Sequence, residues 1–142
     1  MNYMELAIIE AKKSDIDIPV GAVIVKDGKV IAKAHNLREK NNDVTSHAEI
    51  IAMREAEKLL NNWRLTDCEM YVTLEPCPMC GWAILQSRIK KIHFGAYDNV
   101  YGAFSTNLDL KSVANSKLEV YGGIMEEECQ KILTQYFEKM RK

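Results

Sequence analysis

Apolar residues recur at helical spacing in the first dozen positions of the chain and then form two short continuous runs. The recurrence at intervals of three and four residues predicts an amphipathic helix over residues 2–13. The runs 20–25 and 30–34 are predicted to be strands, because the Asp27-Gly28 pair between them is typical of a two-residue hairpin turn. The chain is therefore expected to open with a helix followed by a β-hairpin.

Helices and single strands alternate in the rest of the chain. The polar run at residues 35–45 predicts a loop, and helical periodicity continues from Ser46 to about Asn61. Further along we expect a strand at 69–74, a helix at 78–86, a strand at 89–95, a helical turn at 107–113, a strand at 117–121 and a helix at 126–140. The connection between the last two strands is long enough for a crossover, which predicts that they run parallel.

This order of elements predicts an α/β fold, a three-layer α/β/α sandwich around a mixed five-stranded sheet. The length suits one domain spanning residues 1–142. Helices on both faces need strands that are apolar on both sides, and residues 21–25 form such a run. In the last helix we expect five side chains to point inward: Cys129, Ile132, Leu133, Tyr136 and Phe137.

Composition and charge narrow the possible classes of protein. Hydrophobic residues make up 47% and charged residues 27% of the 142 positions, as in globular proteins. Neither a membrane-spanning run of roughly 18 apolar residues nor a signal peptide is recognisable, so a cytoplasmic protein is expected. The net charge of −1 gives no overall attraction to nucleic acid, which would need a local basic patch. The candidates for such a patch are Arg64, Arg88, Lys90, Lys91, Lys139, Arg141 and Lys142.

Residues suited to metal chemistry gather in two short segments, 46–49 and 76–80. His47, Cys77 and Cys80 offer one imidazole and two thiolates, which are three zinc ligands and leave one tetrahedral position open. Zinc with an open position lowers the pKa of its bound water to about 7 and so supplies a hydroxide nucleophile. Glu49, two residues after the histidine, is placed to move the protons. The sequence therefore predicts a catalytic site with one zinc per subunit.

Each segment also fits a structural alternative. A Cys-x-x-Cys pair occurs in redox motifs and zinc fingers, and Ser46 with Glu49 has the pattern of a helix capping box. A structural zinc site would need a fourth protein ligand, and Cys68 is expected at the far end of the strand that precedes Cys77. We expect structural roles for the other histidines and cysteines: His35, Cys68, His93 and Cys129. The combination of His-x-Glu with Pro-Cys-x-x-Cys favours the catalytic site.

Longer stretches carry a family resemblance. Residues 47–50 (His-Ala-Glu-Ile), 62–65 (Asn-Trp-Arg-Leu), 71–80 (Tyr-Val-Thr-Leu-Glu-Pro-Cys-Pro-Met-Cys) and 87–89 (Ser-Arg-Ile) resemble the bacterial tRNA-specific adenosine deaminases of the cytidine deaminase-like superfamily. The resemblance implies that family's fold, a homodimer, and conversion of the wobble adenosine of a tRNA anticodon to inosine by attack of zinc-bound hydroxide at C6. It implies neither an organic cofactor nor a membrane.

The resemblance also implies a role for each residue of the site. His47, Cys77 and Cys80 would bind zinc, and Glu49 would be the proton shuttle. On the substrate side, Asn36 would hydrogen-bond the flipped base, the Ala48 backbone would contact its edge, and Asp98 would lie near the neighbouring nucleotide.

Departures from the family pattern lie on the substrate side. Phe104 stands where a glycine is expected, Val44 replaces a frequent proline, and the longer basic tail of many members is missing. With Tyr97 and Tyr101, Phe104 is expected either to stack on an RNA loop or to pack the crossover against the sheet. The main alternative function is a deaminase of a free base or nucleoside, such as guanine, cytosine or cytidine. A catalytically inactive scaffold subunit is a further alternative, which the presence of Glu49 disfavours.

Overall fold

The computed structural model describes residues 2–141 and contains a mixed five-stranded sheet with the strand order β2-β1-β3-β4-β5. The strands are β1 (Gly21–Lys26), β2 (Lys29–His35), β3 (Cys68–Leu74), β4 (Lys91–Ala96) and β5 (Glu119–Tyr121). Strand β1 pairs antiparallel with β2 and β3, whereas β3, β4 and β5 run parallel. The mixed sheet and the parallel final pair are both confirmed.

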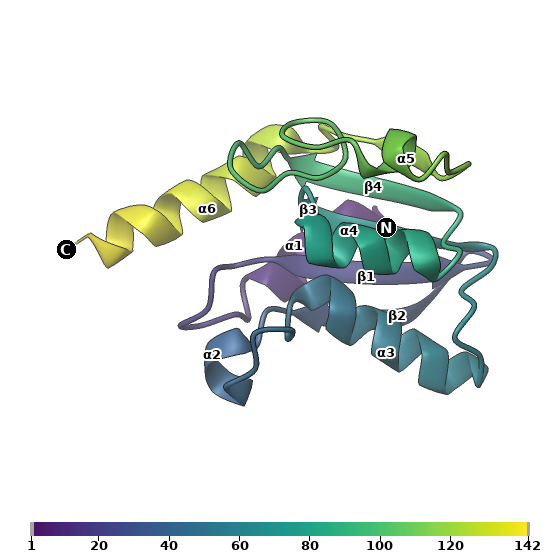
Figure 1. Ribbon diagram of the computed structural model, residues 1–142. Coiled ribbons are helices and arrows are strands. Elements are labelled where there is room, and N and C mark those ends of the chain that lie inside the picture. The colour runs from purple at the N-terminus through teal and green to yellow at the C-terminus, as the bar shows by residue number, and fades with distance from the viewer. Residues whose placement is uncertain (1, 142) are drawn as a thin grey trace.

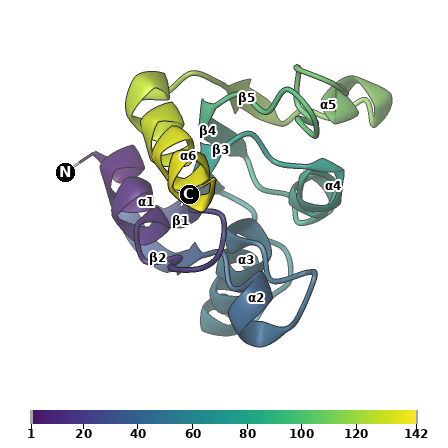
Figure 2. The ribbon, with the colours of Figure 1, turned by 90° about the vertical axis from the view of Figure 1, so that its left-hand side faces the viewer.

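Helices cover both faces of this sheet (Figures 1 and 2), which confirms the three-layer sandwich. They are α1 (Tyr3–Ala11), α2 (Arg38–Asn41), α3 (Ala48–Leu60), α4 (Pro78–Gln86), α5 (Leu110–Val113) and α6 (Glu126–Met140). Helices α1 and α6 lie on one face, and α3 and α4 lie on the other. The short helix α2 interrupts the predicted loop. None of the helices described is long and apolar enough to cross a membrane.

The two sides of β1 contribute to two different hydrophobic clusters. Ala22 and Ile24 pack with residues of α3 and α4, while Val23 and Val25 pack with α1 and α6. Residues 21–25 are all buried, as the apolar run predicted. At Gly21 a Cβ atom would lie 2.0 Å from the Ala7 carbonyl oxygen, so only glycine lets α1 cross the sheet this closely.

The hairpin between β1 and β2 forms as its sequence predicted. Asp27 and Gly28 have φ angles of 51° and 73°, and positive φ at both central residues is the requirement of a type I′ turn. Lys26 pairs with Lys29 across the turn. The turn sets this pairing next to it, and an irregularity between Ile24 and Val25 shifts the register of the rest of the hairpin by one residue.

Helix α6 has the predicted bounds but a narrower buried face than predicted. Cys129 and Leu133 are buried and Ile132 is half-buried, whereas Phe137 is 45% exposed. Figure 1 shows the reason, because the C-terminal turns of α6 extend past the edge of the sheet and have no layer to cover. The inward orientation predicted for Phe137 was therefore wrong. Half-buried Tyr136 is anchored by its hydroxyl, which donates to the Ile16 carbonyl at 3.0 Å.

The three aromatic residues after β4 have separate environments. Phe104 is buried in the cluster beneath α3 and α4, which confirms packing at this position. Tyr97 sets its ring edge-on to Phe94, with centroids 5.1 Å apart, yet is 40% exposed. Tyr101 is 63% exposed. The large side chain at the position expected to be glycine therefore contributes to the core.

Truncating Phe104 is expected to destabilise the protein. Phe104→Ala should lower the free energy of unfolding by about 3 kcal/mol, the usual cost of removing a buried phenyl ring and leaving a cavity. Chemical denaturation monitored by circular dichroism measures this change. Tyr101→Ala is the matched control, since its exposed ring should be worth well under 1 kcal/mol. Equal effects of the two substitutions would contradict the packing described here.

Candidate metal centre

Three side chains from distant parts of the sequence meet at one point. Single ligand atoms of His47, Cys77 and Cys80 all lie within 4.8 Å of one another. The His47 Nδ1 atom lies 3.4 Å from the Cys80 sulfur and 3.7 Å from the Cys77 sulfur. Ligands at tetrahedral angles with Zn–S and Zn–N bonds of about 2.3 and 2.0 Å stand about 3.5 Å apart. The donor set and its spacing therefore fit one zinc ion.

Two helix starts create this arrangement. His47 is the N-cap residue of α3 and Cys77 is the N-cap residue of α4, both with extended backbone angles, and Cys80 lies in the first turn of α4. Neither N-cap side chain makes a capping hydrogen bond, so both remain available to a metal. The positive ends of two helix dipoles also favour thiolate over thiol, as expected from the sequence.

The capping box of Ser46 and Glu49, the structural alternative for this segment, is absent. The helix begins one residue later than predicted, because the Ser46 hydroxyl donates to Asp43 at 3.1 Å and accepts from the Asn41 amide at 3.3 Å. His47 takes the N-cap position instead. Glu49 is therefore not used as a cap.

Burial and charge shape the electrostatics of this centre. Glu49 is 4% exposed, and burial raises the pKa of its carboxyl group to about 7. A hydrogen bond between the two thiols lowers the pKa of Cys77 to about 4, and the same contact raises the pKa of Cys80. The cysteine pair thus carries negative charge, which suits a cation, and the carboxyl group beside it can change protonation near neutral pH.

Asn36 and Ala48 lie next to this centre and bond to each other. The Ala48 N–H donates to Asn36 Oδ1 at 2.8 Å, and Asn36 Nδ2 donates to the Ile18 carbonyl at 2.9 Å. Asn36 is 6% exposed, so its orientation is fixed. The two groups predicted to contact a base are therefore held together at the amino end of α3.

Asp98 lies in the loop that follows β4. Its Oδ1 atom accepts the N–H groups of Val100 and Tyr101, both at 3.0 Å. The same loop returns to the metal-ligand segment, where the Ala103 N–H donates to the Pro76 carbonyl at 3.0 Å. The loop bearing Asp98 is thus connected directly to the residue before Cys77.

Sequence reasoning missed Glu75. This side chain is 1% exposed and accepts hydrogen bonds from the Asp98 loop. The available signal was a carboxylate directly before Pro76-Cys77, at the end of an otherwise apolar strand. An ionisable residue at such a position is unusual for a core and indicates a specific set of partners.

The remaining histidines and cysteines have structural surroundings. His35 Nδ1 lies 3.4 Å from Glu10. His93 lies 3.0 Å from Glu69 and is stacked between Tyr71 and Tyr121. The two other cysteines, Cys68 and Cys129, are buried and free. Among residues 2–141, no second group of three potential ligands comes together in this way.

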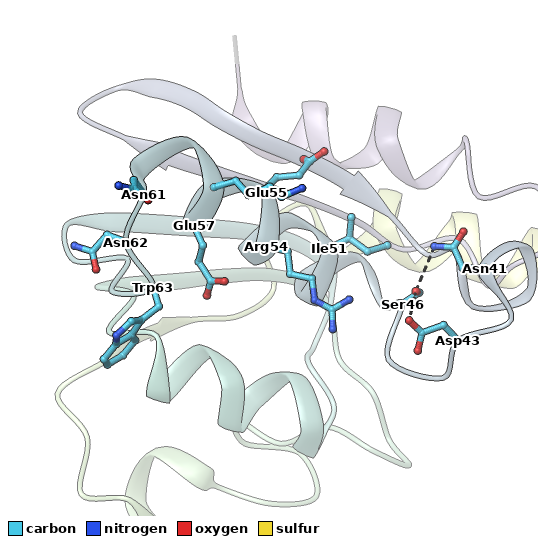
Figure 3. Close-up of a pocket in the computed structure, with 11 residues that line it drawn as sticks. Asn41, Asp43, Ser46, Ile51, Arg54, Glu55, Glu57, Asn61, Asn62 and Trp63 are labelled. Carbon is cyan, nitrogen blue, oxygen red and sulfur yellow. Dashed lines mark hydrogen bonds between the residues drawn. The ribbon is translucent and has the colours of Figure 1, made fainter.

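A cavity of about 830 Å³ along α3 does not contain the metal group (Figure 3). Its lining residues are Asn41, Asp43, Ser46, Ile51, Arg54, Glu55, Glu57, Lys58, Asn61, Asn62 and Trp63. Both signs of charge are present, and the lining offers no thiol or imidazole. The residues suited to metal chemistry therefore lie at the metal group, outside this cavity.

Of the proposed basic residues, Arg64 lies over the Trp63 ring at 4.4 Å, and Lys142 lies outside the described residues.

Comparisons with known proteins identify the family of this chain. Residues 1–96 match the cytidine and deoxycytidylate deaminase zinc-binding region. The chain is 45% identical over 144 residues to the tRNA-specific adenosine deaminase of Bacillus subtilis (strain 168), covering 99% of this chain and 89% of that protein. It is 41% identical to the Agrobacterium fabrum protein of the same name, covering 99% and 95%.

Solved structures give a matching result. A chain from a study of A-to-I editing by tRNA:A34 deaminases at the wobble position of transfer RNA superposes with a TM-score of 0.89. Its identity is 41%, and the match covers 92% of this chain and 98% of the other. A guanine deaminase from Bacillus subtilis superposes with a TM-score of 0.67 at 36% identity, covering 82% and 73%.

Proposed function

The chain belongs to the tRNA-specific adenosine deaminases of the cytidine and deoxycytidylate deaminase zinc-binding family, and from this premise we propose that it converts the wobble adenosine of a tRNA anticodon to inosine. The reaction replaces the C6 amino group by oxygen from water and releases ammonia. The observation that carries the proposal is the buried carboxyl group of Glu49 beside a His-Cys-Cys group with zinc-ligand spacing.

His47, Cys77 and Cys80 are proposed to hold the zinc ion. Zinc bound by three protein ligands acts as a Lewis acid that lowers the pKa of a water molecule to about 7. The two helix starts hold the ligand atoms in place, so little rearrangement is needed for binding.

Glu49 is proposed to move protons during the reaction. Its carboxylate would take one proton from the attacking water and pass it to the ring nitrogen of adenine, and would then carry the second proton, from the new C6 hydroxyl, to the amino group that leaves as ammonia. Burial supports this role because it raises the pKa of Glu49 to about 7, where both protonation states are accessible. A general base works best with a pKa near the operating pH.

Asn36, Ala48 and Asp98 are proposed to orient the substrate. One Nδ2 hydrogen of Asn36 is used by the Ile18 carbonyl, which leaves the second to bond the base. The bond from Ala48 to Asn36 keeps that amide from rotating. Asp98 is proposed to lie near the neighbouring nucleotide.

The substrate, the location and the assembly are proposed from the family resemblance. An anticodon loop presents unstacked bases, so extruding one costs less than the few kcal/mol needed in a duplex. We place the enzyme in the cytoplasm, with its tRNA. A homodimer is proposed as well, and the partial exposure of Trp63 and Trp82, at 51% and 46%, supplies apolar surface for it. Sedimentation velocity measures the assembly state.

A free base is the second candidate substrate, because the guanine deaminase of Bacillus subtilis shares 36% identity with this chain. The test incubates zinc-loaded protein separately with an anticodon stem-loop, guanine, cytosine and cytidine, and measures ammonia release. We expect release from the stem-loop alone. Release from guanine with an unaltered stem-loop would favour the second candidate.

A further inference from the structure

Glu75 is a buried carboxylate surrounded by hydrogen-bond donors of one loop. Its Oε1 atom accepts the Asp98 N–H at 3.1 Å and the Thr106 hydroxyl. Its Oε2 atom accepts three consecutive backbone N–H groups, those of Phe104 at 3.1 Å, Ser105 at 3.1 Å and Thr106 at 3.2 Å. No ion pair found among residues 2–141 includes Glu75. The donors that compensate its burial therefore come from the loop between Asp98 and Thr106.

Backbone hydrogen bonds join residues 75 and 76 to the last residue of β4 and to the same loop. The Glu75 N–H donates to the Ala96 carbonyl at 2.8 Å, and the Pro76 carbonyl accepts the Ala103 N–H at 3.0 Å. The loop thus closes around residues 75–76, immediately before Cys77. Its two ends are held by one short segment of chain.

Gly102 shows how closely the loop approaches the Glu75 side chain. A Cβ atom at this position would lie 2.4 Å from Glu75 Oε1 and 2.5 Å from the Asp98 carbonyl oxygen. Contacts this short are not tolerated, so a glycine is needed for the loop to close on the carboxylate. The close packing of the loop around the Glu75 carboxylate therefore depends on residues of both segments, Glu75 before Cys77 and Gly102 in the loop.

We propose that Glu75 is a positioning residue, which fixes Asp98 relative to the metal centre so that the nucleotide beside the target is bound in register with the reacting base. The inference rests on the proposed function. Glu75 is two residues from Cys77, and its Oε1 atom accepts the Asp98 N–H. A single carboxylate thus links the segment that supplies two metal ligands to the loop that contacts the substrate.

Glu75→Gln tests this link at the Asp98 end. The amide oxygen can still accept the three N–H groups of residues 104–106, while the NH₂ group replaces Oε1 and cannot accept the Asp98 N–H. We expect KM for an anticodon stem-loop to rise about tenfold, the size of effect of one hydrogen bond to a charged group. Zinc content should be unchanged, and kcat should fall much less than KM rises.

A double-mutant cycle distinguishes a specific effect on the position of Asp98 from a general loosening of the loop. In an Asp98→Ala background, Glu75→Gln should have no further effect on KM, because the group that it positions is gone. Additive effects would overturn the proposal. Glu10→Gln is the matched control. Glu10 lies in α1 and is also buried, at 5% exposure, but its carboxyl group pairs with Lys13 and His35 instead of the Asp98 loop. An equal rise of KM in this control would also overturn it.

Thr106→Val provides a test that does not alter the buried carboxylate. It removes the hydroxyl donor from an exposed residue, so the protein should fold, and KM should rise in the same direction by a smaller factor. An unchanged KM would contradict the proposal. Failure of the proposed function is distinguishable, because wild-type protein would then form no inosine, whereas an active wild type with unchanged variants refutes only the role of Glu75.

Discussion

Glu49→Gln is expected to reduce the turnover of adenosine to inosine by at least ~10²- to 10⁴-fold, the usual contribution of a positioned proton-transfer group. The amide keeps the size and burial of the side chain but can neither take a proton from water nor return it. Zinc should remain bound at one ion per chain, because Glu49 is not among the clustered ligands. Single-turnover kinetics together with elemental analysis measure both quantities.

Glu55→Gln is the matched control, since Glu55 lies on the same helix α3 but is exposed. It should leave turnover and zinc content unchanged. Substantial residual turnover in Glu49→Gln would remove Glu49 from the mechanism. Loss of zinc from that variant would instead mean that Glu49 supports the metal site.

Cys80→Ala is expected to lose both zinc and activity. The buried Cys80 sulfur lies 3.4 Å from His47 Nδ1, and without it only two protein ligands remain. Since metal binding is coupled to folding, the variant should also unfold at a lower temperature than zinc-loaded wild type. A chelator should lower the melting temperature of wild type and leave that of the variant unchanged.

Cys68→Ala serves as the control for Cys80→Ala. Cys68 is equally buried but begins strand β3, at the end of the strand away from Cys77. This variant should keep one zinc per chain, even if the smaller side chain costs some stability. A full complement of zinc in Cys80→Ala would exclude Cys80 as a ligand.

The elements that sequence analysis located best depend on local chemistry. The turn at Asp27-Gly28 needs positive φ at both residues, and few residue pairs supply it. Helix α4 begins at Pro78, where proline suits the first turn, and its bounds agree with the prediction. The connection before β5 is too long for a hairpin and long enough for the parallel crossover that the structure contains.

The errors came from contacts between distant or competing groups. Ser46 has the sequence pattern of an N-cap, but Asp43 and Asn41 bond its hydroxyl, and His47 takes the position. The helical period marked Phe137 as inward, yet periodicity does not reveal where the sheet beneath a helix ends. Both outcomes depend on partners that a local pattern does not identify.

The candidate site, too, could be predicted from the sequence only in part. The metal group was recognisable because His-x-Glu and Pro-Cys-x-x-Cys restrict both residue type and spacing. The enclosure of Glu75 was not recognisable, because most of its hydrogen-bond donors are backbone N–H groups, which every residue other than proline supplies. Phe104 stood out as a departure from the family pattern, but only its packing revealed its place in the core.

The most direct test of the central claim is inosine formation at the wobble position of a synthetic anticodon stem-loop, read by nuclease mapping or sequencing. The protein is used zinc-loaded, and again after removal and restoration of zinc. We predict inosine at the wobble position alone, its loss on removal of zinc, and its recovery on restoration. Unaltered adenosine with fully zinc-loaded protein, or inosine formation that persists without zinc, would contradict the account.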